Sequence, residues 1–291
     1  MIQLRPYEFM VKYTPQRDWI EGHGILIAFA LFFGGISGGL YLASLYFDSM
    51  WGMFIAWLLA GLTGATDMAH LSKPMRFWRM LLRVRTSWIS RGFILIWTFL
   101  GLGAIQLALS YWAPGTAAET VFRVLAGIAS FGVAVYSGFV IGFVVGIKLW
   151  NSAIVPILFV IAGLTGGLAI LLLVSLGNAS QGMPVARLML AALVVYAVFV
   201  AIYLWVTTYE SSGARDSVVR ILRGDVAPVF WLVVVLVGIL VPLAILVPLS
   251  LAHRALTPGF IVASACTIIG GVALRYTILK AGVYNPLVPA D

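Results

Sequence analysis

The chain of 291 residues is 62% hydrophobic and only 10% charged, and its formal net charge is +8. A soluble domain of this size is about half apolar and a quarter charged, so the composition excludes a soluble enzyme, a disordered chain and a disulfide scaffold. It predicts an all-α integral membrane protein whose solvent is the lipid bilayer. In such a protein the positive charge indicates loops that face the cytoplasm, and no nucleic-acid partner is expected.

Eight apolar runs are long enough, at about 20 residues, to cross a bilayer as helices. The first run is too long for the core of a signal peptide, so we expect it to be retained. An even number of spans puts both termini on the same side. The runs lie near residues 24–47, 52–69, 91–112, 124–147, 152–177, 187–208, 227–251 and 259–279.

Lysine and arginine are distributed unevenly between the two sides of the predicted spans. The side of the termini carries fifteen of them, with Arg275 counted near the end of the last span. The opposite side carries three, Arg123, Arg187 and Arg254. The positive-inside rule therefore predicts that both termini are cytoplasmic. A basic docking face for an acidic partner would give the same distribution.

A glycine-rich motif occurs twice, 128 residues apart: residues 34–40 read GGISGGL and residues 162–168 read AGLTGGL. The same offset maps spans two to four roughly onto spans six to eight. We therefore predict two four-helix bundles, residues 1–147 and 148–291, related by a pseudo-twofold axis along the membrane normal. Independent small-residue packing motifs would give the same pattern.

Ionisable residues near the membrane gather at one level, on the side of the termini: Glu21 and His23 before the first span, then Asp67 and His70 at the end of the second. Charge inside a membrane is costly and is a functional hypothesis by default. Asp67 and His70 are three residues apart on one helix face, so the carboxylate can orient the imidazole and form a proton-handling pair. The alternative is an ordinary helix end, where His suits the dipole and Asp67 pairs with an arginine.

A basic segment, residues 72–91, follows the second span. Pro74 ends or bends the helix. Arginines then recur on one face, and Phe77, Trp78 and leucines form the other, which is typical of a segment lying in the membrane interface. Such a segment either anchors the chain to lipid headgroups or docks a peripheral subunit. The candidate docking residues are Lys73, Arg76, Arg79 and Arg83.

Cysteine and histidine are too few for the common redox centres. Cys266 is the single cysteine, so we expect no iron–sulfur cluster within this chain. Of the three histidines, His253 lies on the opposite side from His23 and His70, and these two lie near the membrane surface. We therefore expect no haem and no other bound metal.

Several motifs together resemble the NrfD/PsrC family, the quinone-reactive membrane subunits of polysulfide-reductase-type respiratory complexes. The resemblance covers nearly the whole chain. It depends on the glycine-rich first span, on Asp67-x-x-His70-Leu71-x-Lys73-Pro74-x-Arg76-Phe77, on Ser87-Trp88-x-Ser90-Arg91-Gly92, on Tyr136-Ser137-Gly138 and on Trp150-Asn151-Ser152.

The resemblance implies two four-helix bundles with the quinone site in the first. It implies a menaquinone or ubiquinone bound among His23, Tyr136, Asp67 and His70, with Asp67 and His70 handling protons. Its partners would be a ferredoxin-like iron–sulfur subunit, a molybdopterin catalytic subunit and the quinone pool of a prokaryotic inner membrane. Several relatives dock their partners on the outer face, whereas the basic side of this chain reads as cytoplasmic. Either the partners are cytoplasmic here, or the basic loops serve docking.

Two other function classes remain open at this point. A secondary transporter would place polar groups near the midplane, often with broken helices, and Pro156, Pro242 and Pro248 are possible breaks. A purely structural anchor would bind no quinone analogue and would tolerate replacement of Asp67 or His70.

Overall fold

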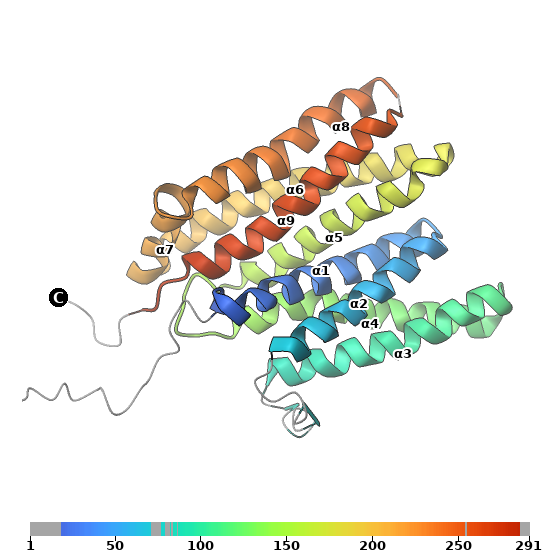
Figure 1. The fold of residues 1–291 in the computed structure, drawn as a ribbon, viewed down its shortest axis with the longest axis horizontal. Coiled ribbons are helices and arrows are strands. Elements are labelled where there is room, and N and C mark those ends of the chain that lie inside the picture. The colour runs from blue at the N-terminus through green and yellow to red at the C-terminus, as the bar shows by residue number, and fades with distance from the viewer. Residues whose placement is uncertain are drawn as a thin grey trace, which may run out of the picture.

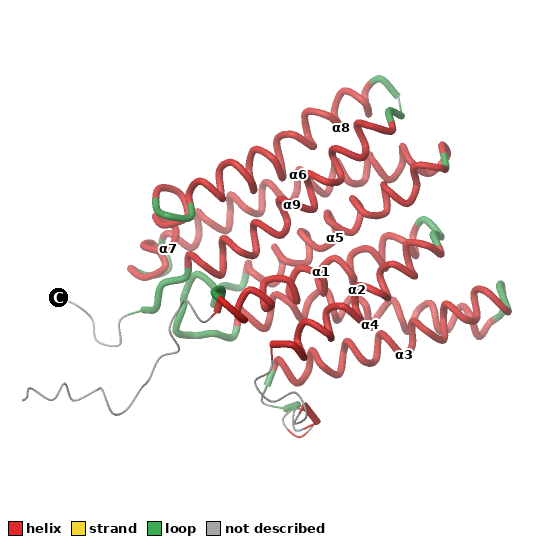
Figure 2. Tube along the Cα trace, in the orientation of Figure 1, coloured by secondary structure: helices red, strands yellow, loops and turns green. Residues whose placement is uncertain are grey.

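The computed structural model describes residues 19–70, 77–78, 82, 84–85, 87–253 and 255–285. Within these residues the regular elements are helices, and eight of them are long and apolar enough to cross a membrane, as predicted. Figure 1 shows the long helices side by side, with α1–α4 in one half of the molecule and α5, α6, α8 and α9 in the other. Figure 2 shows that the loops lie at the two ends of the helices.

The helices follow the predicted order. They are η2 (Gly22–Gly24), α1 (Ile25–Tyr46), α2 (Met50–His70), α3 (Trp88–Trp112), α4 (Ala117–Gly142), α5 (Ile154–Val174), η4 (Ser175–Gly177), α6 (Ala179–Thr208), α7 (Ser212–Arg223), the π-helical η5 (Val229–Leu240), α8 (Val241–Leu251) and α9 (Thr257–Ala281).

The surface that surrounds the helices is apolar. Large side chains such as Trp51, Ile128 and Trp205 are mostly exposed, at 71%, 66% and 68%. Aromatic residues also gather at helix ends, as Tyr46 and Trp112 do. Outward apolar side chains with aromatic residues at the ends are the arrangement expected of helices in a bilayer. The chain is therefore a multi-pass membrane protein.

Two of the predicted spans start too late for the same reason, which is that a helix can start with polar residues. The fourth span starts at Ala117, not near residue 124, because the Thr116 side chain caps the helix by accepting a hydrogen bond from the Glu119 N–H. The sixth span starts at Gln181 and not near residue 187. A search for apolar runs misses such polar first turns.

The amphipathic helix α7 was not predicted. Its buried face consists of small and aliphatic residues, including Ala214, Val218 and Ile221, while Arg215 and Arg223 are exposed. Ser211 caps its start through the Ala214 N–H. Twelve residues with this composition form a short helix on the surface and are too few and too polar to span a bilayer.

The three prolines considered as possible helix breaks do not break a helix. Pro156 is the third residue of α5, where no intrahelical N–H bond is required. Pro242 is the second residue of α8, after the π-helical η5, and α8 continues through Pro248. The discontinuous spans that a transporter would favour are not seen at these prolines.

The two copies of the glycine motif pack against each other. A Cβ on Gly39 would lie 2.4 Å from the carbonyl oxygen of Gly163, and a Cβ on Gly163 would lie 2.4 Å from that of Gly35. The backbones of α1 and α5 therefore touch where the motifs cross, which only glycine allows. The pseudo-twofold relation and the division into bundles at residue 147 stay predictions.

Candidate functional site

A cavity of about 230 Å³ lies among α1, α2, α3 and α4, near the ends of these helices on the side of Trp19. Most of its lining is aliphatic or aromatic, and Asp67 and Tyr136 are the ionisable residues in it. A mostly apolar cavity with few polar groups is typical of a small-molecule site. The lining residues are Trp19, Ile27, Ala30, Leu31, Gly64, Asp67, Met68, Ile89, Phe93, Ile96, Trp97, Tyr136 and Val140.

Asp67 enters the cavity from the last turn of α2. Its side chain is half-buried, and it forms no hydrogen bond or ion pair with any residue that the structure describes. Asp67 lines the cavity, where a carboxylate can accept a hydrogen bond from a ligand or exchange a proton.

Tyr136 reaches the same cavity from α4, and its position depends on a glycine. A Cβ on Gly92 of α3 would lie 1.8 Å from Cε2 of Tyr136 and 2.1 Å from Cζ. The ring therefore occupies the space of the missing side chain, so that Tyr136 is 6% exposed and still lines the cavity. Tyr136 and Asp67 thus line the same cavity from two different helices.

The two histidines of the predicted site are placed differently. His23 belongs to η2, directly before α1, where it is exposed and is not part of the cavity lining. His70 is the last residue of α2, and its side chain lies outside the described residues. The structure thus brings together Asp67 and Tyr136, and the quinone roles of all four residues stay predictions.

The predicted docking residues Lys73, Arg76, Arg79 and Arg83 lie outside the described residues. Other residues of the basic segment are described, among them Phe77 and Leu82. Phe77 packs on the cavity residue Phe93 with ring centroids 5.7 Å apart, and Leu82 is 75% exposed.

Arg91, which ends the basic segment and belongs to the predicted family motif, holds Val84 and Arg85 of that segment next to α3. Its Nε donates to the carbonyl of Val84 at 3.0 Å, and its Nη2 donates to that of Arg85 at 2.8 Å. The guanidinium also lies over the ring of Trp88, which stacks on Phe139 of α4 at 4.5 Å. These contacts fix the end of the segment next to the helices that form the cavity.

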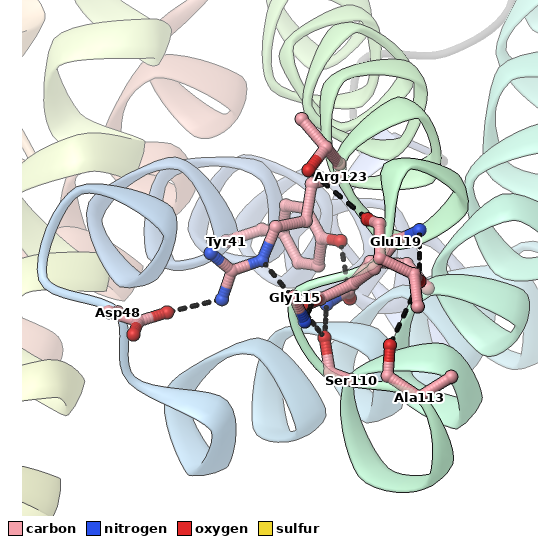
Figure 3. A network of polar contacts seen from close by, with 10 residues as sticks. Tyr41, Asp48, Ser110, Ala113, Gly115, Glu119 and Arg123 are labelled. Carbon is pink, nitrogen blue, oxygen red and sulfur yellow. Dashed lines mark hydrogen bonds and ion pairs between the residues drawn. The ribbon is translucent and has the colours of Figure 1, made fainter.

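A second polar network lies at the opposite end of α1, α3 and α4, and Figure 3 shows it. The buried Tyr41 hydroxyl donates to Oε1 of Gln106 at 2.8 Å, and Nε2 of Gln106 donates to Ser110 at 2.8 Å. Ser110 then donates to Oε1 of Glu119 at 2.6 Å, and the Gly115 N–H donates to Oε2 at 2.7 Å.

The network continues from Glu119 to the first connection of the chain. Arg123 pairs with Glu119 at 3.3 Å and also with Asp48, between α1 and α2. The network therefore ties the α1–α2 connection to the α3–α4 connection. Arg123 was expected in a loop, and Glu119 had no predicted role. The network could not be predicted because its contacts join residues that are far apart in the chain.

Arg275 was counted as a charge near the end of the last span, and this assignment is wrong. It lies within α9, six residues before the end of the helix, and its exposed fraction is 0%. Without Arg275 the predicted distribution is fourteen basic residues against three, so the prediction from charge keeps its direction.

The described ends of the chain meet on one side of the molecule. Nε1 of Trp19 donates to the hydroxyl of Tyr284 at 3.3 Å, and Trp19 packs edge-to-face on Trp150 at 5.2 Å. On the other side, Arg187 contacts the ring of His253. The cavity therefore lies on the side where the described ends meet, and His253 lies on the other.

Comparison with known proteins gives consistent matches over most of the chain. The family model described as "Polysulphide reductase, NrfD" matches residues 22–286. The C subunit of the polysulfide reductase of Wolinella succinogenes is 26% identical over 297 residues, which cover 88% of this chain and 92% of that protein. Protein NrfD of Escherichia coli is 25% identical over 248 residues, covering 73% and 76%. The chain therefore belongs to the polysulphide reductase NrfD family.

Proposed function

We propose that this chain is the quinone-reactive membrane subunit of a respiratory redox complex, in which it passes electrons between the quinone pool and a peripheral iron–sulfur subunit. The observation that carries the proposal is the cavity into which Asp67 and Tyr136 both open. A quinone has an apolar ring with two carbonyl oxygens, and it needs an apolar cavity with a few hydrogen-bonding groups.

The two ionisable residues match the chemistry of quinone reduction, which takes up two electrons and two protons. The Tyr136 phenol can donate a hydrogen bond to one carbonyl oxygen. The Asp67 carboxylate can take up a proton from the aqueous side and deliver it to the ring. We propose that His23 and His70 complete this proton path. His23 lies just before the start of α1 and His70 is the last residue of α2, so both belong to the helix ends nearest the cavity.

The cavity also offers a route for the isoprenoid tail. Ile89 and Trp97 of α3 both line the cavity, and each is 55% exposed on the outer surface of the helices. A tail that leaves the cavity beside either side chain would enter lipid directly. A menaquinone and a ubiquinone both need such an exit, because each carries an isoprenoid tail on its quinone ring.

The proposal includes the predicted partners. A ferredoxin-like iron–sulfur subunit would dock on the basic segment 72–91, and it would connect to a molybdopterin catalytic subunit. The complex would lie in a prokaryotic inner membrane, with both termini of this chain cytoplasmic. Support comes from the nearness of the basic segment to the cavity, because Phe77 packs on the cavity residue Phe93.

Two conservative variants test the function in the assembled complex. Asp67→Asn removes the proton acceptor, and Tyr136→Phe removes the donor while keeping the ring that packs on Gly92. Both are expected to lower quinone-linked turnover by at least about tenfold, since a positioned acid or base contributes roughly 10²–10⁴-fold. Activity of the catalytic partner with a viologen dye should not change.

Tyr46→Phe provides the matched control, because Tyr46 is 79% exposed at the opposite end of α1. It should keep the full quinone-linked rate. Equal quinone turnover in Asp67→Asn, Tyr136→Phe and the wild type, with normal assembly, would refute the proposed site.

A further inference from the structure

Arg275 carries the most deeply buried cationic group in the described part of the chain. Its exposed fraction is 0%, and Nη1 donates to the Gly271 carbonyl at 3.0 Å within α9. The other two guanidinium nitrogens, Nε and Nη2, are buried without a hydrogen-bond partner. The group lies over the rings of Phe32 on α1 and Phe159 on α5, at 5.6 and 5.2 Å from their centroids.

No described carboxylate neutralises this charge. The ion pairs found among the described residues belong to Arg123 and Arg220. The Tyr196 hydroxyl interacts electrostatically with the guanidinium, but it is also buried without a hydrogen-bond partner. An uncompensated charge in an apolar interior is costly, and its field is weakly screened, so it acts over a longer distance than a surface charge does.

The guanidinium lies beside Gly35 of α1, one helical turn beyond the cavity residue Leu31. A Cβ on Gly35 of α1 would lie 3.1 Å from Nη2 of Arg275 and 3.7 Å from Oγ of Ser137 on α4. Ser137 follows the cavity residue Tyr136, and Phe32 follows the cavity residue Leu31. Arg275 thus reaches from the second half of the chain to the two helices that carry one side of the cavity.

We propose that the charge of Arg275 makes the cavity favour a negatively charged quinone ring over a neutral ring of the same shape. The inference depends on the proposed function, because it assigns a property to the quinone site. Arg275 does not line the cavity, so it is a positioning residue that acts through the electric field. It offsets the repulsion between Asp67, the acidic residue in the lining, and any negative charge on the ring.

Such a field has a clear use in quinone chemistry. Electrons reach the ring one at a time from an iron–sulfur partner, and each must be matched by a proton. When an electron arrives before its proton, the ring bears negative charge, and a fixed cation stabilises that charge without reorganisation. A lysine at this position would keep the charge, whereas methionine would keep similar bulk and lose it.

Binding of two matched probes to the purified full chain tests the inference. The first probe is 2-hydroxy-1,4-naphthoquinone, which is ionised at neutral pH, and the second is its neutral 2-methoxy counterpart. Quenching of tryptophan fluorescence reports binding, because Trp19 and Trp97 line the cavity. Wild type is expected to bind the ionised probe at least as tightly as the neutral one.

Arg275→Met should weaken binding of the ionised probe roughly tenfold, because removal of a buried unit charge removes a weakly screened attraction. It should leave binding of the methoxy probe unchanged, and this second measurement shows that the cavity remains folded. Arg275→Lys should keep the preference of the wild type. A merely structural role for Arg275 would change both probes together.

Three results would count against the inference. The ratio of the two affinities could be the same in wild type and Arg275→Met, or wild type could bind the ionised probe more weakly than the neutral one. The comparison of the two probes in the wild type needs no variant, so it tests the inference even if Arg275→Met does not fold. If wild type binds neither probe, the cavity is not a quinone site, and the proposed function fails together with the inference.

Discussion

The ring of Tyr136 lies on the backbone of Gly92, so closely that a β-carbon at position 92 would be 1.8 Å from Cε2. Two helices, α3 and α4, are therefore held at a separation that depends on the absence of one side chain. The same contact fixes the ring of Tyr136, which lines the cavity. Gly92 sets the position of a proposed donor without any polar group of its own.

Gly92→Ala is expected to move the Tyr136 ring out of its place and to lower quinone-linked turnover at least as much as Tyr136→Phe does. The reason is steric, since the ring must rotate or α3 must shift to admit the methyl group. Turnover with quinol and with a viologen dye should be measured in the same preparation. Gly101→Ala is the control on the same helix, because no atom lies within 4 Å of a Cβ at that position. Unchanged quinone turnover in Gly92→Ala would show that the position of Tyr136 does not matter.

The basic segment is expected to hold the iron–sulfur partner through charge. Reversal of Arg76, Arg79 and Arg83 to Glu should release the partner at moderate ionic strength, because docking between charged surfaces weakens with salt and with charge reversal. Co-purification of the partner over a salt series measures the effect.

The matched control for this reversal is the pair Arg215→Glu and Arg223→Glu on α7, since both arginines are exposed. These changes should leave the partner bound. Release by the α7 pair and retention by the triple variant would move the docking surface to the second half of the chain.

The crossing of α1 and α5 is expected to be the most sensitive packing contact. Gly39→Ala places a methyl group 2.4 Å from the Gly163 carbonyl oxygen, so the helices must separate along their length. We expect a loss of about 3 kcal/mol or more in the free energy of unfolding. Gly61→Ala on α2, where a Cβ meets nothing within 4 Å, should be neutral or slightly stabilising. Thermal unfolding in detergent compares the two, and equal midpoints would contradict the close contact.

The network around Glu119 is expected to stabilise the fold and to leave the cavity unaffected. Glu119→Gln removes the charged acceptor shared by Ser110, the Gly115 N–H and Arg123. Its loss should cost about 1–3 kcal/mol of stability. Binding of a neutral quinone analogue should not change, because the network lies at the opposite end of the helices. A large loss of binding would reveal a connection between the two ends of the molecule.

The sequence predicted the features that depend on composition and local spacing. Eight spans follow from apolar length alone, and the family motifs led to Asp67 and Tyr136, which the structure places in one cavity. Features that depend on contacts between distant residues could not be predicted. Gly92 matters only because Tyr136, 44 residues later, packs on it.

Arg275 was misplaced for a related reason. The local sequence does not show whether an arginine near the end of an apolar run extends to the aqueous side or into the protein interior. Only the packing of α9 against α1 and α5, with Phe32 and Phe159 around the guanidinium, separates the two. The helix α7 was not predicted because the search was for long apolar runs. Its twelve residues include several charged side chains, and such a composition is more typical of a loop.

Photolabelling with a tritiated azidoquinone tests the central claim most directly, which is that the cavity of α1–α4 holds the quinone. The label should attach to peptides from α2 and α3 that contain the lining residues Met68, Phe93 and Trp97. Excess unlabelled quinone should suppress the labelling, and Gly92→Ala should reduce it. Labelling confined to α6–α9, or labelling of α2 and α3 that excess quinone does not suppress, would contradict the account.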